Sequence, residues 1–392
     1  MWVLECDGDV LQNKRIWLRP GKKYLFGRTR LGTGFAIENK SISRKHLTIS
    51  LAEVKPGDGS LVHTRSTLTI EDQNSKIGTL LDGEQIRGQS RILKDDEHQI
   101  KLGSYEFLFR IKWVPVVISF SFPSKEQKKK DPLLTVRSRL EALDVKTVLP
   151  YIIDKTTHVV ANKRNTAKGL QALINARCIV TESFIDALVA AASPQDPDDS
   201  ESQSLLEFDF DANWPDALQY LPDPGKEPFP RPSFYFAPDP HRTKIFEGYI
   251  FVFCDQAQFD NLQPPIVNGG GKALIYRLEV GKTTAADVVR FAKNAAGEKG
   301  LGEFEDKSEG EGVVLVRFRA KDPYETWAIE LGNEIAQSLD QRVIEQSEFL
   351  DAILTNNPAT LRKQLPEEDD GTLPPSAALP PSSLFPMWNH RQ

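Results

Sequence analysis

The sequence predicts a multidomain protein in which an all-β sandwich is followed by two α/β modules, each with a parallel sheet flanked by helices. Three observations predict this class. The chain has 392 residues, which is too many for one hydrophobic core. Residues 1–111 consist of short apolar runs separated by Gly, Asp and Asn turns, which is typical of a sandwich. From Val116 onward, apolar runs alternate with helical patterns, which is typical of α/β structure.

We assign the β-sandwich to residues 1–111. Its expected strands are residues 2–4, 24–26, 47–49, 68–70, 79–81 and 106–109. Turn residues separate them, most clearly Asp82-Gly83 and the Pro- and Gly-containing run 55–59. Because no part of this region has convincing helical periodicity, the sequence predicts a domain built from strands alone.

We assign the first α/β module to residues 112–193. Its expected strands are residues 116–120, 157–160 and 179–180, and its expected helices are 133–143, 166–176 and 183–192. The second helix is amphipathic, with Leu170, Leu173 and Ile174 on one face. The predicted order of elements is β-α-β-β-α-β-α, which has one strand more than the three assigned to residue ranges.

A second α/β module is predicted at residues 233–356. Phe184-Ile185-Asp186-Ala187-Leu188 recurs as Phe349-Leu350-Asp351-Ala352-Ile353, a weak internal repeat with a short apolar strand before each copy. This second module carries a longer, Gly-rich insertion at 298–312. Residues 194–232 are rich in proline and acidic residues and are predicted to be a linker, docked in part through Phe208, Phe210 and Trp214. Residues 357–392 are predicted to be a disordered, Pro-rich tail.

Composition excludes several classes of protein. No apolar run approaches the ~20 residues that a membrane span needs, and the N-terminus lacks the pattern of a signal peptide. The cysteines, Cys6, Cys178 and Cys254, are too far apart to form a zinc quartet or a disulfide framework, which favours a reducing compartment. The histidines form no metal-binding motif. We therefore expect no metal and no cofactor.

The charge is distributed unevenly. The formal net charge is −6, but between Val10 and His46 a run of basic residues is opposed only by Glu38. This basic patch consists of Lys14, Arg15, Arg19, Lys22, Lys23, Arg28, Arg30, Lys40, Arg44 and Lys45. Such a patch on an acidic protein indicates a specific anionic ligand, with a merely solvated face as the alternative.

Part of this patch has the composition of a phosphate-binding site. A phosphate group favours a planar guanidinium, a second cation and neutral hydroxyl or amide donors, all held on rigid loops. Loops between the predicted strands supply this set, namely Arg28, Ser43, Arg44, Lys45, Ser75 and Lys76. The sequence therefore predicts a phosphate-binding site in the first domain.

Three segments resemble the forkhead-associated (FHA) domain, a family of phosphopeptide-binding β-sandwiches. They are Gly27-Arg28, Ser41–His46 and Asp72–Thr79. The resemblance implies that Arg28 and Ser43 contact the phosphate, that Arg44 contacts the peptide and that Lys76 contributes to the phosphate site. It implies structural roles for Gly27, His46, Gly78 and Thr79.

The sequence departs from the FHA pattern at two positions. Many FHA domains have an asparagine at the position of Ile77, where it bonds the backbone of the bound peptide, and Asn-Gly in place of Asp82-Gly83. Phosphate recognition should survive these changes. Other residues must recognise the peptide backbone beyond the phosphorylated residue.

The α/β modules resemble BRCT repeats in their order of elements and in Thr157-His158-Val159-Val160. The resemblance implies a second phosphate site made by Lys168 and a hydroxyl after the first strand. Ser121 is the preferred partner, with Ser119 and Ser124 as alternatives, and the glycine that usually follows this hydroxyl is absent. A solvent-facing helix lysine is the competing interpretation of Lys168.

Gly281-Lys282-Thr283 resembles the end of a nucleotide-binding P-loop. The glycine that such a loop requires five residues earlier is Tyr276, so its backbone could not wrap around phosphates. No other catalytic constellation is evident. We therefore expect a protein that is not an enzyme.

An FHA domain followed by two BRCT repeats resembles the N-terminal region of the Nijmegen breakage syndrome protein family. That resemblance implies a nuclear, non-enzymatic adaptor that binds acidic phosphothreonine motifs and serves a double-strand-break repair complex with nuclease and SMC-like ATPase subunits. The family's segments that bind the nuclease and a kinase lie nearer its C-terminus, so we expect this chain to be a fragment. The alternative is a nucleic-acid-binding module that uses the basic patch, although the net charge makes direct binding an unfavoured outcome.

Overall fold

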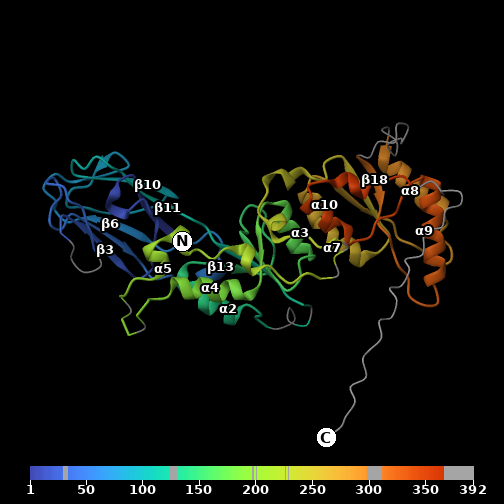
Figure 1. The fold of residues 1–392 in the computed structure, drawn as a ribbon, viewed down its shortest axis with the longest axis horizontal. Helices are drawn as coiled ribbons and strands as arrows, with labels where there is room; N and C mark the ends of the chain where they lie inside the picture. Colours follow the sequence, from blue (N-terminus) through green and yellow to red (C-terminus); the bar gives the residue numbers. More distant parts are fainter. Residues whose placement is uncertain are drawn as a thin grey trace, which may run out of the picture.

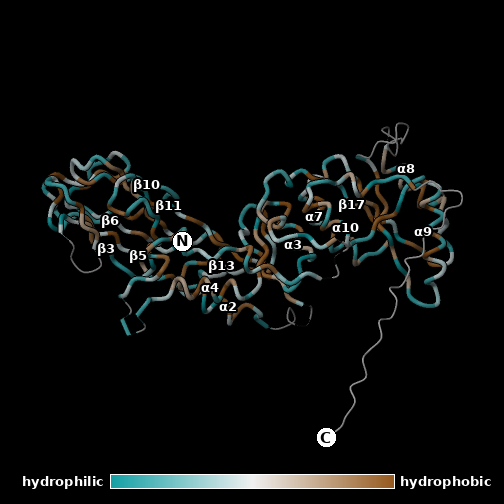
Figure 2. Tube along the Cα trace, viewed as in Figure 1, coloured by the Kyte–Doolittle hydropathy of each residue, from teal (hydrophilic) through white to brown (hydrophobic). Residues whose placement is uncertain are grey.

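The computed structural model describes residues 1–29, 34–123, 125, 130–196, 198–199, 201–225, 227, 229–297 and 311–365. A β-sandwich and two α/β modules follow one another along the long axis of the molecule (Figure 1). Hydrophobic segments run through the interior of these domains (Figure 2). The predicted fold class is confirmed.

Two sheets form the N-terminal sandwich. The six-stranded sheet has the order β2-β1-β11-β10-β7-β8 and the five-stranded sheet has the order β4-β3-β5-β6-β9. The strands are β1 Trp2–Cys6, β2 Ile16–Leu18, β3 Lys23–Gly27, β4 Phe35–Ala36, β5 Leu47–Leu51, β6 Leu68–Asp72, β7 Thr79–Leu81, β8 Glu84–Gln85, β9 Ser90–Ile92, β10 Glu97–Leu102 and β11 Phe109–Trp113. Short 3-10 turns lie at η1 Asp9–Leu11 and η2 Asp58–Ser60. Alternate strand residues such as Leu47, Ile49 and Leu51 are buried between the sheets, as the sandwich requires.

The first α/β module has a four-stranded parallel sheet of order β13-β12-β14-β15. Its elements are β12 Val117–Ser121, α2 Leu134–Leu140, η3 Glu141–Leu143, β13 Lys146–Val148, β14 His158–Ala161, α3 Ala167–Ile174, β15 Cys178–Val180 and α4 Glu182–Ala192. Thr166 caps α3 by accepting a hydrogen bond from the Gly169 N–H.

The second module repeats this plan with an additional helix. Its elements are η5 Ser233–Phe236, η6 Pro240–Lys244, β16 Tyr249–Phe253, α7 Gln256–Asn268, β17 Lys272–Ile275, α8 Ala285–Ala296, β18 Gly312–Leu315, α9 Glu325–Leu339, α10 Glu348–Leu354 and η8 Pro358–Leu361. The sheet order is β17-β16-β18, and Val316 pairs in parallel with Ile344. The repeated phenylalanines, Phe184 and Phe349, are both buried in their modules.

The C-terminal boundary of the second module lies beyond the one expected. Leu361 is fully buried, and Arg342 N–H donates to the Lys363 carbonyl. The described residues 357–365 therefore pack on this module. The rest of the expected tail, residues 366–392, and most of the insertion, residues 298–310, lie outside the described residues.

The sandwich is fixed to the first α/β module by polar contacts across their interface. Glu141 Oε1 accepts hydrogen bonds from the N–H groups of Gly57 (2.6 Å) and Gly59 (2.9 Å). Lys146 Nζ, which is buried, bonds Asp144 Oδ1 at 2.7 Å and donates to Thr64 Oγ1 at 3.2 Å. Because these groups are fixed from both sides, the two domains form a defined interface rather than a flexible junction.

The two α/β modules share one hydrophobic core. Helix α3 of the first module packs against α7 and α10 of the second. Leu170 and Leu173 on α3 belong to the same buried cluster as Ile266 on α7 and Leu350 on α10. The relative position of the modules is therefore set by apolar packing.

Much of the expected linker packs on the first two domains. It contains α5 Leu205–Phe208, α6 Phe210–Asn213 and η4 Ala217–Tyr220. Helix α5 contacts both β2 of the sandwich and α4 of the first module. Phe210 is buried, whereas Phe208 is 53% exposed. We call residues 201–211 the acidic strap, because Glu201, Glu207, Asp209 and Asp211 lie within it.

Candidate functional site

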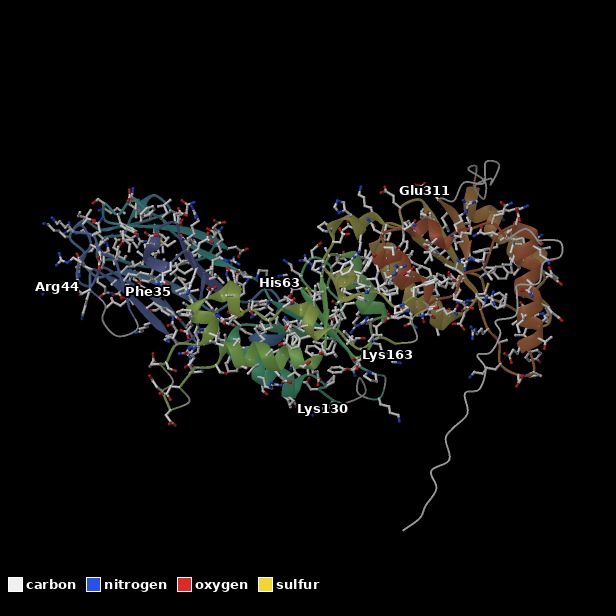
Figure 3. The ribbon with its side chains drawn as sticks, in the orientation of Figure 1. Phe35, Arg44, His63, Lys130, Lys163 and Glu311 are labelled. Carbon is white, nitrogen blue, oxygen red and sulfur yellow. The ribbon has the colours of Figure 1, made fainter. Side chains whose placement is uncertain are left out.

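An open pocket lies at the outer end of the sandwich, where the predicted phosphate-binding residues meet. Its volume is about 620 Å³, and Arg44, labelled in Figure 3, marks its position. The residues that line it are Arg28, Lys40, Ser41, Ile42, Ser43, Arg44, Lys45 and Lys76. Lys40 and Ser41 were not among the predicted site residues, although the basic patch and the Ser41–His46 segment already contained them.

Gly27 allows two loops of the pocket to touch. A Cβ at this position would collide with the carbonyl oxygen of Arg44. Because glycine leaves that space open, the Arg28 N–H donates to the Ser43 carbonyl at 2.9 Å, and the His46 N–H donates to the Phe26 carbonyl at 2.9 Å. This contact holds Arg28 and Ser43 next to each other on two neighbouring loop segments.

His46 supports the pocket from below. It is fully buried, its Nδ1 accepts a hydrogen bond from the Ser43 N–H at 3.2 Å, and its Nε2 lies 3.1 Å from the Gly78 carbonyl oxygen. Burial lowers the pKa of His46, so the imidazole is neutral and Nε2–H is the donor to Gly78. One side chain thus connects the Ser43 loop with the Lys76 loop.

The pocket presents donors that the protein does not itself use. The Ser43 hydroxyl oxygen accepts the Lys76 N–H at 3.0 Å, which leaves its own proton free to donate outward. Five basic residues line the pocket, namely Arg28, Lys40, Arg44, Lys45 and Lys76. Among the described residues, no carboxylate forms an ion pair with any of them. The arrangement suits a multiply charged anion.

Ser75 does not belong to the ligand-facing set, which corrects the expectation. It is fully buried, its hydroxyl donates to Asp72 Oδ2 at 2.7 Å, and it accepts the Gly78 N–H at 3.0 Å. Thr79 also donates to Asp72 at 2.7 Å. Burial raises the pKa of Asp72, but hydrogen bonds from Gly88, Ser75 and Thr79 outweigh it, so the pKa lies below its usual value. Ser75 therefore shapes the turn that carries Lys76.

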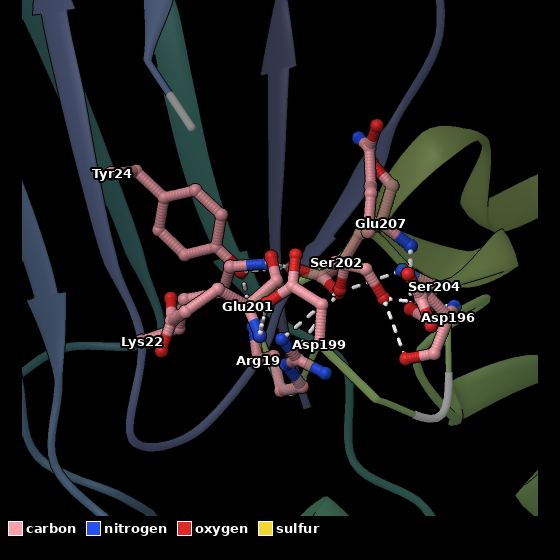
Figure 4. A network of polar contacts seen from close by, with 10 residues as sticks. Arg19, Lys22, Tyr24, Asp196, Asp199, Glu201, Ser202, Ser204 and Glu207 are labelled. Carbon is pink, nitrogen blue, oxygen red and sulfur yellow. Dashed lines mark hydrogen bonds and ion pairs between the residues drawn. The ribbon is translucent and has the colours of Figure 1, made fainter. Parts of the chain in front are cut away.

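The basic patch of the sandwich is divided between two uses. Four of its members contact the acidic strap, as Figure 4 shows for Arg19 and Lys22. Lys22 Nζ lies 2.9 Å from Glu207, and Arg15 makes two bonds to Asp211, at 2.9 and 2.5 Å. Lys14 lies over the Phe208 ring at 3.7 Å. The basic residues of the pocket remain available for a ligand, while Arg30 lies outside the described residues.

Glu207 is the centre of the contact between the strap and the sandwich. It is buried, accepts a hydrogen bond from the Tyr24 hydroxyl at 2.8 Å, and lies 3.5 Å from Arg19. The Ser204 side chain and Glu207 also form a reciprocal capping box that starts α5. A buried carboxylate with this many partners fixes the strap in place.

The structure places Lys168 beside the end of β12, but its ammonium group is already engaged. Lys168 Nζ donates to the Phe120 carbonyl at 2.5 Å and also to the Leu149 carbonyl. Burial lowers the pKa of Lys168. Ser119 is fully buried and its hydroxyl bonds the Leu149 and Pro150 carbonyls, whereas Ser121 is half-buried. Ser124 lies outside the described residues.

The Gly281-Lys282-Thr283 segment lies just before α8. The Thr283 hydroxyl accepts the Glu279 N–H at 2.8 Å, and Asp287 occupies the N-terminus of α8 by bonding Thr284. Over the described ranges, no group of three or more His, Cys, Asp or Glu side chains could hold a metal ion. Within the same residues, no helix is both long and apolar enough to cross a membrane.

Comparisons with known proteins agree with this arrangement. Residues 24–103 match the family described as "FHA domain", and residues 240–364 match "Second BRCT domain on Nijmegen syndrome breakage protein". The fold is similar to the solved FHA/BRCT-repeat domain of Nbs1 from Schizosaccharomyces pombe, with a TM-score of 0.51 and 18% identity over 90% of this chain and 100% of that one. The fold and the pocket together define an FHA protein with tandem BRCT repeats.

Two curated relatives narrow the assignment. Nibrin from Gallus gallus is 26% identical over 268 residues, which is 68% of this chain and 32% of that protein. The DNA repair and telomere maintenance protein nbs1 from S. pombe is 26% identical over 194 residues, 48% of this chain and 30% of that protein. The chain is a homologue of nibrin and Nbs1 across their FHA and BRCT domains. It spans about a third of the length of these relatives.

Proposed function

We propose that this protein is a non-enzymatic adaptor that binds phosphothreonine peptides in the pocket of its FHA domain. One observation carries the proposal. Arg28, Lys76 and the Ser43 hydroxyl converge on an open pocket whose lining residues include three further cations and no carboxylate. A phosphate dianion supplies the charge and the acceptor oxygens that this set lacks.

Each pocket residue has a distinct part in the proposed interaction. The Arg28 guanidinium and the Ser43 hydroxyl donate to the phosphate oxygens, and Lys76 adds charge from the facing loop. Arg44 and Lys45, both exposed at the rim, attract acidic residues on either side of the phosphothreonine and increase the rate of encounter. The preference for threonine over serine rests on the resemblance to FHA domains.

The biological setting of the proposal comes from the relatives. The S. pombe relative is a DNA repair and telomere maintenance protein. We propose that this protein acts in the nucleus and recruits phosphorylated partners to DNA double-strand breaks. In this proposal, regions outside the described domains join it to the nuclease and SMC-like ATPase subunits of the repair complex.

The nucleic-acid-binding alternative is weakened by the acidic strap. Lys14, Arg15, Arg19 and Lys22 would have to contribute to a surface that follows a phosphate backbone. Arg15 and Lys22 are instead paired with strap carboxylates. What remains exposed is a compact pocket, which suits one phosphorylated side chain better than a nucleic-acid duplex.

A titration with matched peptides tests the proposal. The full chain is titrated calorimetrically with acidic phosphothreonine peptides, the same peptides after phosphatase treatment, and duplex DNA. Binding that requires the phosphate and is lost in Arg28→Ala supports the proposal. Equal binding before and after phosphatase treatment, or tighter binding to DNA than to any phosphopeptide, contradicts it.

A further inference from the structure

An apolar groove lies between the FHA domain and the first BRCT module, away from the phosphate pocket. Its volume is about 670 Å³. Figure 3 labels one residue from each wall, His63 from the FHA domain and Lys130 from the BRCT module. The apolar residues that line it include Leu61 and Val62 on the first wall and Leu133, Leu149, Pro150 and Ile152 on the second.

The walls of the groove are held in place before any ligand arrives. The FHA wall follows η2, whose Gly57 and Gly59 N–H groups donate to Glu141 of the BRCT module. Thr64, at the end of that wall, accepts a hydrogen bond from the buried ammonium of Lys146. A groove whose two sides are fixed across a domain interface loses little conformational entropy when it binds.

Lys168, expected to bind a second phosphate, and Ser119, an alternative hydroxyl partner, support the floor of this groove. The Lys168 ammonium group donates to the Leu149 carbonyl, and the Ser119 hydroxyl bonds the carbonyls of both Leu149 and Pro150. Leu149 and Pro150 are lining residues. Their backbone is therefore fixed from behind, which leaves their side chains as a rigid apolar surface.

Aliphatic side chains are exposed at and beside the groove. Leu61 lines it and is 52% exposed. Leu134 and Ile153, which follow the lining residues Leu133 and Ile152, are 63% and 50% exposed. Exposed aliphatic side chains gathered from two domains around one hollow are characteristic of a protein-binding surface.

The charges of the groove indicate the chemistry of its partner. Asp131 is neutralised by Arg137 at 2.9 Å, whereas Lys130 forms no ion pair within the described residues. The uncompensated charge in the lining is therefore positive, which favours a carboxylate on the bound segment. A second copy of this chain is disfavoured, because its net charge of −6 adds a general repulsion.

We propose that this groove docks a short acidic segment of a partner protein, with aliphatic or aromatic side chains inserted between Leu61 and Leu149 and a carboxylate beside Lys130. The groove is separate from the phosphate pocket. A partner could therefore occupy it without a phosphate, and a phosphorylated partner could use both sites.

Fluorescence anisotropy of labelled peptides on the full chain tests this. Three matched series are used: Leu- and Phe-containing peptides flanked by Glu, the same peptides flanked by Lys, and Glu-flanked peptides with Ala at the apolar positions. We expect binding in the first series only. Leu61→Glu and Leu134→Glu should each weaken it by about tenfold or more. Both side chains are more than half exposed, so the variants should fold.

Matched controls distinguish specific docking from non-specific hydrophobic binding. Ile92→Glu changes a side chain that is 60% exposed on β9 and does not line the groove, so it should leave peptide affinity unchanged. Phosphopeptide affinity should be unchanged in Leu61→Glu and Leu134→Glu. No binding in the first series, equal binding of the Lys-flanked series, or full binding by both leucine variants would overturn the proposal. So would a dimer in sedimentation that Leu134→Glu dissociates.

Discussion

The two places where the sequence predicts a phosphate differ in how their donors are used. In the FHA pocket, Arg28 and Lys76 have no carboxylate partner among the described residues, and the Ser43 hydroxyl keeps its proton. In the first BRCT module, the Lys168 ammonium and the Ser119 hydroxyl already bond main-chain carbonyls. The same residue types therefore leave donors free in one domain and bond main-chain carbonyls in the other.

The difference shows that residue type alone is a weak criterion for a phosphate site. Whether each donor is free or already hydrogen-bonded within the protein is a better one. Two of the three ammonium protons of Lys168 are donated to main-chain carbonyls, so an anion there would compete with those bonds. An arginine at the rim of an open pocket loses only its hydrating water molecules when it binds an anion. Substitutions in both domains test whether this difference in donors decides where phosphate binds.

The largest effect on ligand binding is expected in the FHA pocket. Arg28→Ala and Ser43→Ala each remove hydrogen bonds to the phosphate worth on the order of 1.5–3 kcal/mol, so each should weaken phosphopeptide binding by about 10- to 100-fold. Calorimetry measures the affinity, and thermal unfolding checks the fold. Arg91→Ala, which removes an exposed arginine of β9 outside the pocket lining, is the control. Wild-type affinity in a folded Arg28→Ala protein would remove the pocket assignment.

A second effect concerns pH and belongs to the BRCT module. Burial, together with the charge of Arg177, lowers the pKa of His158 to about 4 from 6.5. Between these values the unfolded chain binds more protons, so stability should fall as pH drops from 6.5 toward 4, by on the order of 3 kcal/mol. His158→Gln should flatten that part of the profile in urea unfolding. Parallel profiles for both proteins would show that His158 is not the titrating group.

A third effect links stability to binding within the FHA domain. His46→Ala removes the side chain that joins the Ser43 loop to Gly78 and leaves the Gly78 carbonyl without that donor. We expect a loss of about 1–3 kcal/mol in unfolding free energy together with weaker phosphopeptide binding. Denaturant unfolding and calorimetry on one preparation test this. A binding loss with unchanged stability would mean that His46 acts directly on the ligand.

The smallest effect is expected at Lys168. If its ammonium group stays on the Phe120 and Leu149 carbonyls, Lys168→Met should lower stability by about 1 kcal/mol and leave phosphopeptide affinity within about twofold. Singly and doubly phosphorylated peptides with varied spacing between the phosphates make the test complete. If doubly phosphorylated peptides bind wild type more tightly than singly phosphorylated ones and Lys168→Met removes that gain, Lys168 is a second phosphate site after all.

The sequence was sufficient to predict the fold class and most of the residues that line the FHA pocket. Short strands between turns, and then alternating strands and helices, are local patterns that survive in the folded protein. Gly27, Arg28, Ser43 and Lys76 are brought together because their loops lie at one end of the sandwich.

The rest depends on contacts that no local pattern encodes. Tyr24 and Glu207 are 183 positions apart, and Arg15 and Asp211 are 196 apart, so the pairing of the basic patch with the acidic strap could not be predicted from spacing. Ser75 and Lys168 have the residue types that phosphate binding requires. Only the folded backbone shows that Asp72 and the Leu149 carbonyl already use them.

The acidic strap has a consequence for how binding by this protein is measured. Its carboxylates, Asp211 and Glu207, form ion pairs with Arg15, Arg19 and Lys22. A shortened chain that ends before residue 201 would lack the carboxylates paired with Arg15 and Lys22, and it should then adhere to heparin or DNA in a salt-sensitive way that the intact chain does not show. Selectivity for a phosphorylated side chain over polyanions in general would then be a property of chain length as well as of the pocket.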